Sequence, residues 1–295
     1  MSTSMYIDAL LAQQACLWEV TARKPGNVHR YRDFVDVSYL DFATSAAAIA
    51  PVLAVAWERP VGETIFNCVC MVGPLVRRKN TNLGIILLFA PLARAFVHPD
   101  YRANLERVLK ELTVEDARWA FQAIRMANPG GLGNVPEQDV SGEPTVTLRE
   151  AMELAADRDL VARQYANGFR EVFEEAVPAI RQGAERTGSV EGGIISAHLD
   201  LMSRFPDTLI ARKCGVDVAA ESAVRAKRVL ELGWPHTAEG RSEIVALDGW
   251  LRADGNRRNP GTTADLIAAA LFVLLRAGRP ALPAHLPWAL REGAP

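Results

Sequence analysis

The apolar residues of this chain recur mainly at intervals of three and four, which is the spacing of one face of an α-helix. The first segment shows it in Ile7, Leu10, Leu11, Leu17 and Trp18. Few stretches alternate apolar and polar residues with the period of a β-strand, and none does so between hairpin turns. The pattern predicts an all-α protein: one multi-helix domain over residues 1–295, with polar loops between the helices and a proline-rich tail at 279–295.

Residues that favour helix N-termini indicate where several of these helices begin. Pairs of capping residues three positions apart predict helix starts at Thr113 with Asp116, at Thr147 with Glu150 and at Thr262 with Asp265. Including the first segment, the expected helices are a helix at residues 7–18, one from Ser38 to Trp57, Glu63–Arg77, Leu83–Phe96, one capped by Asp100, one from Thr113 to Met126, one opened by Thr147, and helical patterns over Arg158–Arg181, Ile194–Met202, Val216–Leu232, Ile244–Arg252 and Thr262–Arg276.

The segment Asn128–Thr147 interrupts this pattern. It contains four glycines and three prolines, so no helix continues through it. A loop of this length inside a compact domain is usually functional. We therefore expect a functional loop here.

Composition places the chain among ordinary soluble globular proteins, with 49% apolar and 23% charged residues. The net charge of −2 provides no global field that would attract nucleic acid or an anionic membrane. Cys68 and Cys70 have no second pair with which to build a zinc site, so we expect reduced thiols. No targeting or membrane-spanning segment is visible, which predicts a cytoplasmic protein.

Against this balanced charge, cations gather at four turns between predicted helices. Twelve of the 33 Lys and Arg residues lie there: Arg23, Lys24, Arg30, Arg32, Arg77, Arg78, Lys79, Arg212, Lys213, Arg252, Arg257 and Arg258. The same turns are rich in Asn, Gly and Thr. This clustering indicates a bound anion with several phosphates.

Each turn also has a purely structural explanation. Pro25 and Gly26 end a helix, and Arg77 and Lys79 suit the C-terminal end of a helix dipole. The segment Asn80–Asn82 and Asp207 can serve as helix caps. A carboxylate at Glu19 follows a small apolar helix face and is expected to point into a packed or ligand-lined space, and Asp248 is expected to be partly buried with Arg252 as its partner. From the residues alone, both explanations remain open.

Several enzyme classes are excluded by missing motifs. The chain has no P-loop motif, no Rossmann fingerprint, no nucleophile elbow and no zinc-protease helix. The five histidines are scattered, so a histidine-built metal centre is not expected. Phosphate binding must therefore depend on another arrangement.

At the four turns the sequence resembles the triphosphoribosyl-dephospho-CoA synthase family, in matching order from Glu19 to Leu271. The resemblance rests on Glu19, Lys24, Pro25, Gly26 and Val28, on Asn80, Thr81 and Gly84, on Asp207, Thr208, Arg212 and Gly215, and on the run Pro260–Leu266. It implies an all-helical transferase that joins the 5-triphosphoribosyl group of ATP to a dephospho-CoA-like acceptor hydroxyl and releases adenine, in prosthetic-group biosynthesis.

The resemblance and this chemistry together suggest roles for the residues of the turns. Carboxylates are needed as general base or as ligands of the Mg²⁺ that accompanies ATP, and we assign Glu19, Asp207, Asp248 and Asp265 to these catalytic roles, with Glu19, Asp207 and Asp265 as metal ligands. Lys24, Arg30, Arg212 and Arg252 would hold phosphate. Asn80, Thr81, Asn82, Thr262 and Thr263 would bind phosphate or ribose. Gly26, Asn27, His29, Lys213 and Gly261 complete the predicted nucleotide site.

The chain also departs from the family pattern. Asn82 replaces a histidine, His29 replaces an aspartate, and the Gly-rich loop Pro129–Asn134 lacks an Arg and a Glu. These departures predict that 3′-dephospho-CoA is used poorly or is replaced by another acceptor. The alternatives are ATP-dependent transfer to another cofactor precursor such as a C1-carrier intermediate, a non-catalytic nucleotide-binding regulator, and a helical interaction protein. The partners expected are ATP and a small-molecule acceptor, with a homodimer left open.

Overall fold

The computed structural model of the protein describes residues 3–77, 79–129, 138–278 and 287–290. Within these ranges the secondary structure is helical, and the only β-type pairing is an isolated bridge between His29 and Arg32. The predicted all-α fold is therefore confirmed. No helix in the described ranges has the length and apolar character needed to cross a bilayer.

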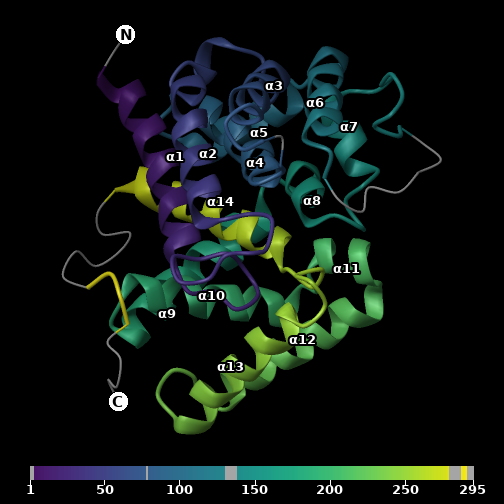
Figure 1. Ribbon diagram of the computed structural model, residues 1–295. Coiled ribbons are helices and arrows are strands. Elements are labelled where there is room, and N and C mark those ends of the chain that lie inside the picture. The colour runs from purple at the N-terminus through teal and green to yellow at the C-terminus, as the bar shows by residue number, and fades with distance from the viewer. Residues whose placement is uncertain (1–2, 78, 130–137, 279–286, 291–295) are drawn as a thin grey trace. The chain divides into compact units, whose positions relative to one another are not determined.

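Figure 1 shows the helices of the described chain in order. Their bounds are α1 Thr3–Thr21, α2 Tyr39–Leu53, α3 Val61–Val72, α4 Leu83–Ala95, α5 Tyr101–Lys110, α6 Val114–Ala127, α7 Leu148–Glu153, α8 Leu160–Asn167, α9 Val177–Thr187, α10 Val190–Arg204, α11 Thr208–Cys214, α12 Val216–Glu231, α13 Ala238–Arg252 and α14 Gly261–Ala277. A 3₁₀ turn, η1, spans Ala56–Glu58, and a π-helix, η2, spans Glu171–Ala176.

The contacts within the chain divide it into two compact units. Unit 1 comprises residues 1–17 and 40–170, and unit 2 comprises residues 18–39 and 171–295. Helix α1 therefore supplies its first part to unit 1 and its last turn to unit 2. A single domain over the whole chain remains a prediction.

Unit 1 is built around α3 and α4. Helix α3 packs against α4 and α6, and α4 also contacts α5 and α8. At the start of α3, the Gly62 amide donates to Asp116 Oδ1 at 2.8 Å. A Cβ at Gly62 would lie 2.3 Å from the carbonyl oxygen of Asp116, so only glycine permits this approach. The buried Tyr165 hydroxyl donates to the Leu87 carbonyl at 2.6 Å and joins α8 to α4.

Unit 2 is built around α14, which is buried from Thr262 to Leu274 apart from the partly exposed Asp265. It contacts α9, α10, α11 and η2, and Figure 1 shows it beside α10. A second apolar cluster joins α10, α11, α12 and α13. Its buried members are Ile195, Leu199, Met202, Ile210, Ala219, Ala226, Val229, Trp234, Leu247 and Leu251. These contacts fix the N-terminal ends of α11 and α14, where the polar turns lie.

Several predicted helix starts are confirmed by cap hydrogen bonds. The capping boxes at Thr113 and Thr147 are both complete, and the Asp100 side chain accepts from the Ala103 amide. The predicted capping box of Thr262 and Asp265 is wrong, because α14 begins at Gly261 after Pro260 and has no side-chain cap. The Thr262 hydroxyl instead accepts a hydrogen bond from Thr208 at 3.1 Å.

Two expected helices end early. The predicted helix Glu63–Arg77 stops at Val72. The helical pattern Arg158–Arg181 is broken after α8 because Gly168 and Phe169 adopt φ values of 72° and 62°, and the π-helix η2 follows. Of the Gly-rich loop Pro129–Asn134, only Pro129 lies within the described residues, so the prediction made for that loop falls outside them.

Candidate functional site

The turn that follows α1 begins with a buried ion pair. Glu19 and Lys24 lie 2.9 Å apart between Oε1 and Nζ, with Lys24 fully buried. The ammonium also contacts the carbonyl oxygens of Glu19 and Ala22. Burial raises the pKa of Glu19, and the Lys24 charge opposes that rise. The expectation that Glu19 points into a packed space is met, and Lys24 finds all these acceptors within the turn.

Glu191 lies at the start of α10 and pairs with two arginines of the segment that follows α1. Its carboxylate accepts from Arg23 Nε at 2.9 Å and Nη2 at 3.0 Å, and it pairs with Arg30 at 3.0 Å. The Glu191 side chain is fully buried. Burial acts to raise its pKa, but the hydrogen bonds and charges of Arg23 and Arg30 prevail, so the pKa of Glu191 is lowered.

Sequence reasoning missed Glu191. Its partners lie 168 and 161 residues away, so no local pattern joins them. The available signal was the Ser189 cap, since it places a glutamate in the first turn of a helix that we predicted to begin only at Ile194. With that start recognised, an acidic residue beside two excess cations would have been a candidate partner.

Asp248 on α13 accepts hydrogen bonds from Gly26 and Arg32 of the segment after α1. Its carboxylate accepts from the Gly26 amide, from Arg252 Nε and from Arg32 Nη1, each at 2.8 Å. Arg252 also donates to the Asn27 carbonyl. The predicted Asp248–Arg252 pairing is confirmed. Gly26 has φ of 76°, in the left-handed region that favours glycine.

Asp207 connects two helix starts. Oδ1 caps α11 by accepting from the amides of Leu209 and Ile210, while Oδ2 accepts from the Thr263 amide at 2.7 Å and the Thr263 hydroxyl at 2.8 Å. The side chain is fully buried. Burial raises the pKa of Asp207, and the four donors oppose this. These hydrogen bonds confirm that Asp207 caps a helix, as the structural explanation of this turn supposed. The metal-binding and catalytic roles of Asp207 remain predictions.

His29 lies in a positive field. Its pKa is lowered to about 4, first by burial and then by the charges of Lys24 and Arg252, against a smaller opposite effect of Asp248. The residue is 9% exposed, and Nδ1 accepts from the Tyr31 amide. His29 is therefore neutral at pH 7, chiefly because it is buried, and the Lys24 and Arg252 charges that also disfavour its protonation would attract an anion.

The lowered pKa of His29 gives an acid-dependent loss of stability. Unfolded histidine takes up a proton below about pH 6.5, whereas folded His29 does so only near pH 4. The folded state therefore loses stability as pH falls from 6.5 to 4. Between pH 7 and pH 5 we expect a His29→Gln variant to lose about 1 kcal/mol less free energy of unfolding than the parent, after discounting for partial solvent access. Urea titrations at both pH values measure this, and equal losses in the two proteins would contradict it.

Three of the four cationic turns meet in unit 2. Asn27 Nδ2 donates to Asn259 Oδ1 at 2.8 Å, which joins the first and fourth turns, and Arg257 donates to the Lys213 carbonyl, which joins the third and fourth. Arg212 and Lys213 are half-buried in the last turn of α11, where burial and the Arg212 charge lower the pKa of Lys213. The buried Oδ1 of Asn27 has no hydrogen-bond partner.

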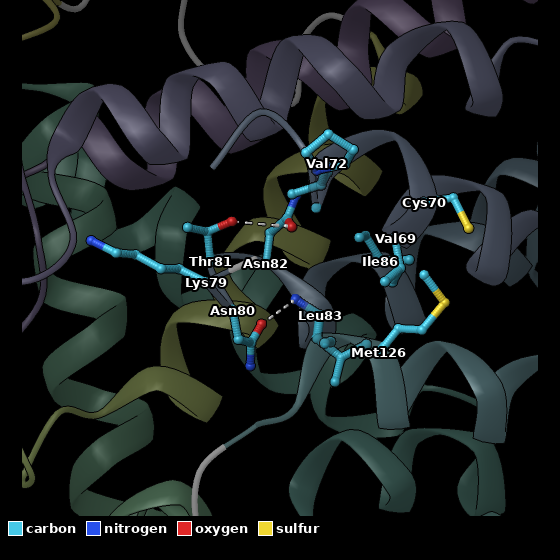
Figure 2. A pocket seen from close by; sticks show the side chains of 13 residues that line it. Val69, Cys70, Val72, Lys79, Asn80, Thr81, Asn82, Leu83, Ile86 and Met126 are labelled. Atoms are coloured by element: carbon cyan, nitrogen blue, oxygen red, sulfur yellow. Dashed lines mark hydrogen bonds between the residues drawn. The ribbon is translucent and has the colours of Figure 1, made fainter. Parts of the chain in front are cut away.

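The second turn, Asn80–Asn82, belongs to unit 1 and lines a pocket of about 600 Å³, open volume included. In Figure 2 the polar side chains of Lys79 to Asn82 lie on the left, and those of Val69, Ile86 and Met126 on the right. The other three turns belong to unit 2, so the joint action of this turn with them stays a prediction.

The predicted metal ligands, which all lie within the described ranges, do not lie together in one cluster. Among the residues that the structure describes, no three His, Cys, Asp or Glu side chains are grouped so as to hold a metal ion. Glu19, Asp207 and Asp248 are occupied by protein donors, and Asp265 is partly exposed. This arrangement does not form a protein cage, but Mg²⁺ commonly binds through one or two carboxylates plus substrate phosphates.

Comparison with known proteins decides the family. The model of the ATP:dephospho-CoA triphosphoribosyl transferase family matches residues 8–281. The chain belongs to this family. The resemblance seen at the four turns therefore extends over nearly the whole chain, and its all-helical expectation agrees with the structure.

Individual members show how far the likeness extends. A Malonomonas rubra protein assigned as 2-(5″-triphosphoribosyl)-3′-dephosphocoenzyme-A synthase is 23% identical over 92% of this chain and 88% of its own. A Stutzerimonas stutzeri protein with the same assignment is 31% identical, over 39% of each chain. A Pseudomonas syringae relative is also 31% identical, over 45% of its length, so this chain spans less than half of these two relatives.

A solved structure of the transferase family has the same fold. The crystal structure of an Archaeoglobus fulgidus protein assigned as a triphosphoribosyl-dephospho-CoA synthase superposes with a TM-score of 0.62 and 26% identity. The superposition covers 79% of this chain and 98% of that one.

Proposed function

We propose that this chain transfers the 5-triphosphoribosyl group of ATP to a hydroxyl of dephospho-CoA or a similar acceptor, with release of adenine. Family membership supports the reaction class. The observation that carries the proposal is the positive field of Lys24, Arg252 and Arg23 at the buried His29, whose pKa is lowered to about 4 first by burial and then by these charges. Such a field suits a polyphosphate that is bound but not cleaved.

The transfer forms one bond and breaks one. The acceptor oxygen bonds to the anomeric carbon of the ribose, and the bond from that carbon to the adenine nitrogen breaks, with its electron pair leaving on adenine. The hydroxyl proton passes to a base, and adenine takes up a proton. The transition state resembles an oxocarbenium ion, so a nearby carboxylate can stabilise it or accept the proton.

The environments of the predicted carboxylates favour different roles for them, two in positioning and two in catalysis. Glu19 and Asp207 are buried and saturated by protein donors, so we assign them to positioning the turn and the two helix starts. Asp248 accepts three hydrogen bonds but, unlike Glu19 and Asp207, is partly exposed, as is Asp265, and these two are our candidates for the base. The ATP would be carried as its Mg²⁺ complex, and Asp265 is placed at the surface of α14 where one carboxylate could join the phosphates.

The cations also divide by exposure. Lys24, Arg30 and Arg252 are engaged with protein acceptors, and Lys24 and Arg252 supply the field at His29. Arg212 and Lys213 are half-buried at the end of α11 and would contact the phosphates directly. Thr262, Thr263 and Gly261 at the start of α14 would complete the phosphate and ribose contacts with Asn27.

Mass spectrometry of reactions with ATP, Mg²⁺ and dephospho-CoA tests the reaction. We expect adenine and the triphosphoribosyl product in equal amounts. A panel of other acceptor alcohols in place of dephospho-CoA tests the prediction that the acceptor differs. Absence of adenine release with every acceptor would leave the nucleotide-binding regulator as the explanation, provided that ATP still binds.

Binding of ATP is tested separately by thermal stability. ATP with Mg²⁺ at low salt should stabilise the protein by about 2.7 kcal/mol when present at a hundred times its Kd. We expect Arg212→Glu to remove most of this stabilisation, because it places a negative charge where phosphate would bind. Arg181→Glu, an exposed residue on α9 in the same unit, is the matched control and should keep it. Equal stabilisation of both variants would refute the assignment of Arg212.

A further inference from the structure

The pocket in unit 1 lies between the end of α3, the start of α4 and the end of α6. Its apolar walls come from Val69, Val72, Ile86 and Met126, and its polar side is the segment Lys79–Asn82. Small-ligand sites are mostly apolar with a few placed polar groups, and the lining of this pocket has that make-up.

Of Asn80, Thr81 and Asn82, the first two make hydrogen bonds that stabilise the fold. Asn80 Oδ1 accepts from the Leu83 amide at 3.1 Å and so caps α4. The Thr81 hydroxyl lies 2.6 Å from the Ser45 hydroxyl and joins the turn to α2. The capping explanation considered for this turn therefore holds for Asn80.

Asn82 makes no comparable stabilising hydrogen bond. It occupies the position before α4, yet its side chain makes no cap hydrogen bond. The residue is 5% exposed, and its one side-chain hydrogen bond is accepted from Thr81 at 3.4 Å, at the long end of the range. The amide nitrogen Nδ2 is buried without a partner, which is an unfavourable state for a polar group unless a ligand completes it.

We propose that this pocket binds the adenine base of a substrate. A flat heteroaromatic ring matches the apolar walls, the Met126 thioether contacts aromatic rings favourably, and Asn82 Nδ2 would donate to a ring nitrogen. Lys79, which extends away from the apolar walls in Figure 2, would be left for the polar remainder of the nucleotide. The inference rests on the proposed function in one respect. The proposed function identifies ATP and dephospho-CoA, which both carry adenine, as the molecules that would bring this base to the pocket.

The test is equilibrium dialysis with adenine alone, which requires no turnover. We expect the wild type to bind adenine and not uracil, and Asn82→Leu to weaken adenine binding at least tenfold. Because the substitution removes an unpaired buried donor, the melting temperature of the Asn82→Leu variant should equal or exceed that of the wild type. Asn104→Leu is the matched control in the same unit. Its amide donates to the Ala95 carbonyl at 2.8 Å, so this variant should melt lower yet bind adenine as the wild type does at temperatures where it is folded.

Absence of adenine binding by the wild type, or equal affinity in Asn82→Leu, would overturn the proposal. The steady-state KM values separate the two sources: a rise for ATP alone assigns the pocket to the leaving base, and a rise for dephospho-CoA alone assigns it to the acceptor. Adenine binding that Asn82→Leu weakens, in a protein without transferase activity, would refute the proposed function and leave the pocket assignment standing.

Discussion

A Glu191→Ala variant is expected to lose about 3 kcal/mol of unfolding free energy and the stabilisation by ATP. The carboxylate is fully buried and pairs with both Arg23 and Arg30, whose side chains are 27% and 19% exposed. Removing one member of a buried ion pair typically costs about 3–5 kcal/mol, and the partial exposure of the arginines places this case at the lower end. Loss of the pairing also frees the turn that generates the field at His29.

Urea denaturation measures the first effect, and the melting shift with ATP and Mg²⁺ measures the second. Glu221→Ala is the control, because Glu221 pairs with Arg225 on the exposed face of α12. It should cost less than about 1 kcal/mol, as surface pairs do. Similar losses in both variants would show that Glu191 does not hold the turn.

Asp207→Asn is expected to lower the unfolding free energy by about 2–3 kcal/mol. The asparagine oxygen can keep the α11 cap, but its NH₂ group would face the Thr263 amide, which is a donor, where Oδ2 now accepts. One buried amide is then left without a partner, and a charge-assisted hydrogen bond is lost. We further expect Thr262 and Thr263 to shift with the start of α14, so activity falls together with stability.

Asp100→Asn is the control for this substitution. Asp100 is an exposed cap that accepts one amide hydrogen bond, and asparagine caps as well as aspartate does. Its stability should be unchanged. If Asp207→Asn instead kept full stability and lost only turnover, Asp207 would be a catalytic or metal-binding group and our assignment to a positioning role would be wrong.

Local features of the fold were predictable from sequence because they depend on residues within a few positions. The capping boxes at Thr113 and Thr147 were correct, since a hydroxyl and a carboxylate three residues apart can satisfy two helix N-terminal amides without help from elsewhere. The box predicted at Thr262 failed because α14 already begins at Gly261, and the Thr262 hydroxyl accepts from the distant Thr208 instead. A tertiary contact therefore occupies the group that was predicted to form a local cap.

The same reasoning explains what was predictable at the candidate site. The four turns were found because their composition departs from that of the rest of the chain. The partner of Asp248 was found because Arg252 lies one helical turn away. Glu191 was missed because its partners are distant, and the different condition of Asn80 and Asn82 was invisible because only packing decides which amide caps a helix and which is buried without a partner.

The long sequence separations at the turn after α1 have a consequence for the order of folding. Gly26 finds Asp248 across 222 residues, and Arg23 finds Glu191 across 168. Contacts of such high separation are costly to close and tend to form late. In a chain growing from its N-terminus, the cations of the turn thus stay hydrated until α10 and α13 have been synthesised. The field at His29 is consequently a property of the finished chain, and no N-terminal fragment ending before Glu191 can reproduce it.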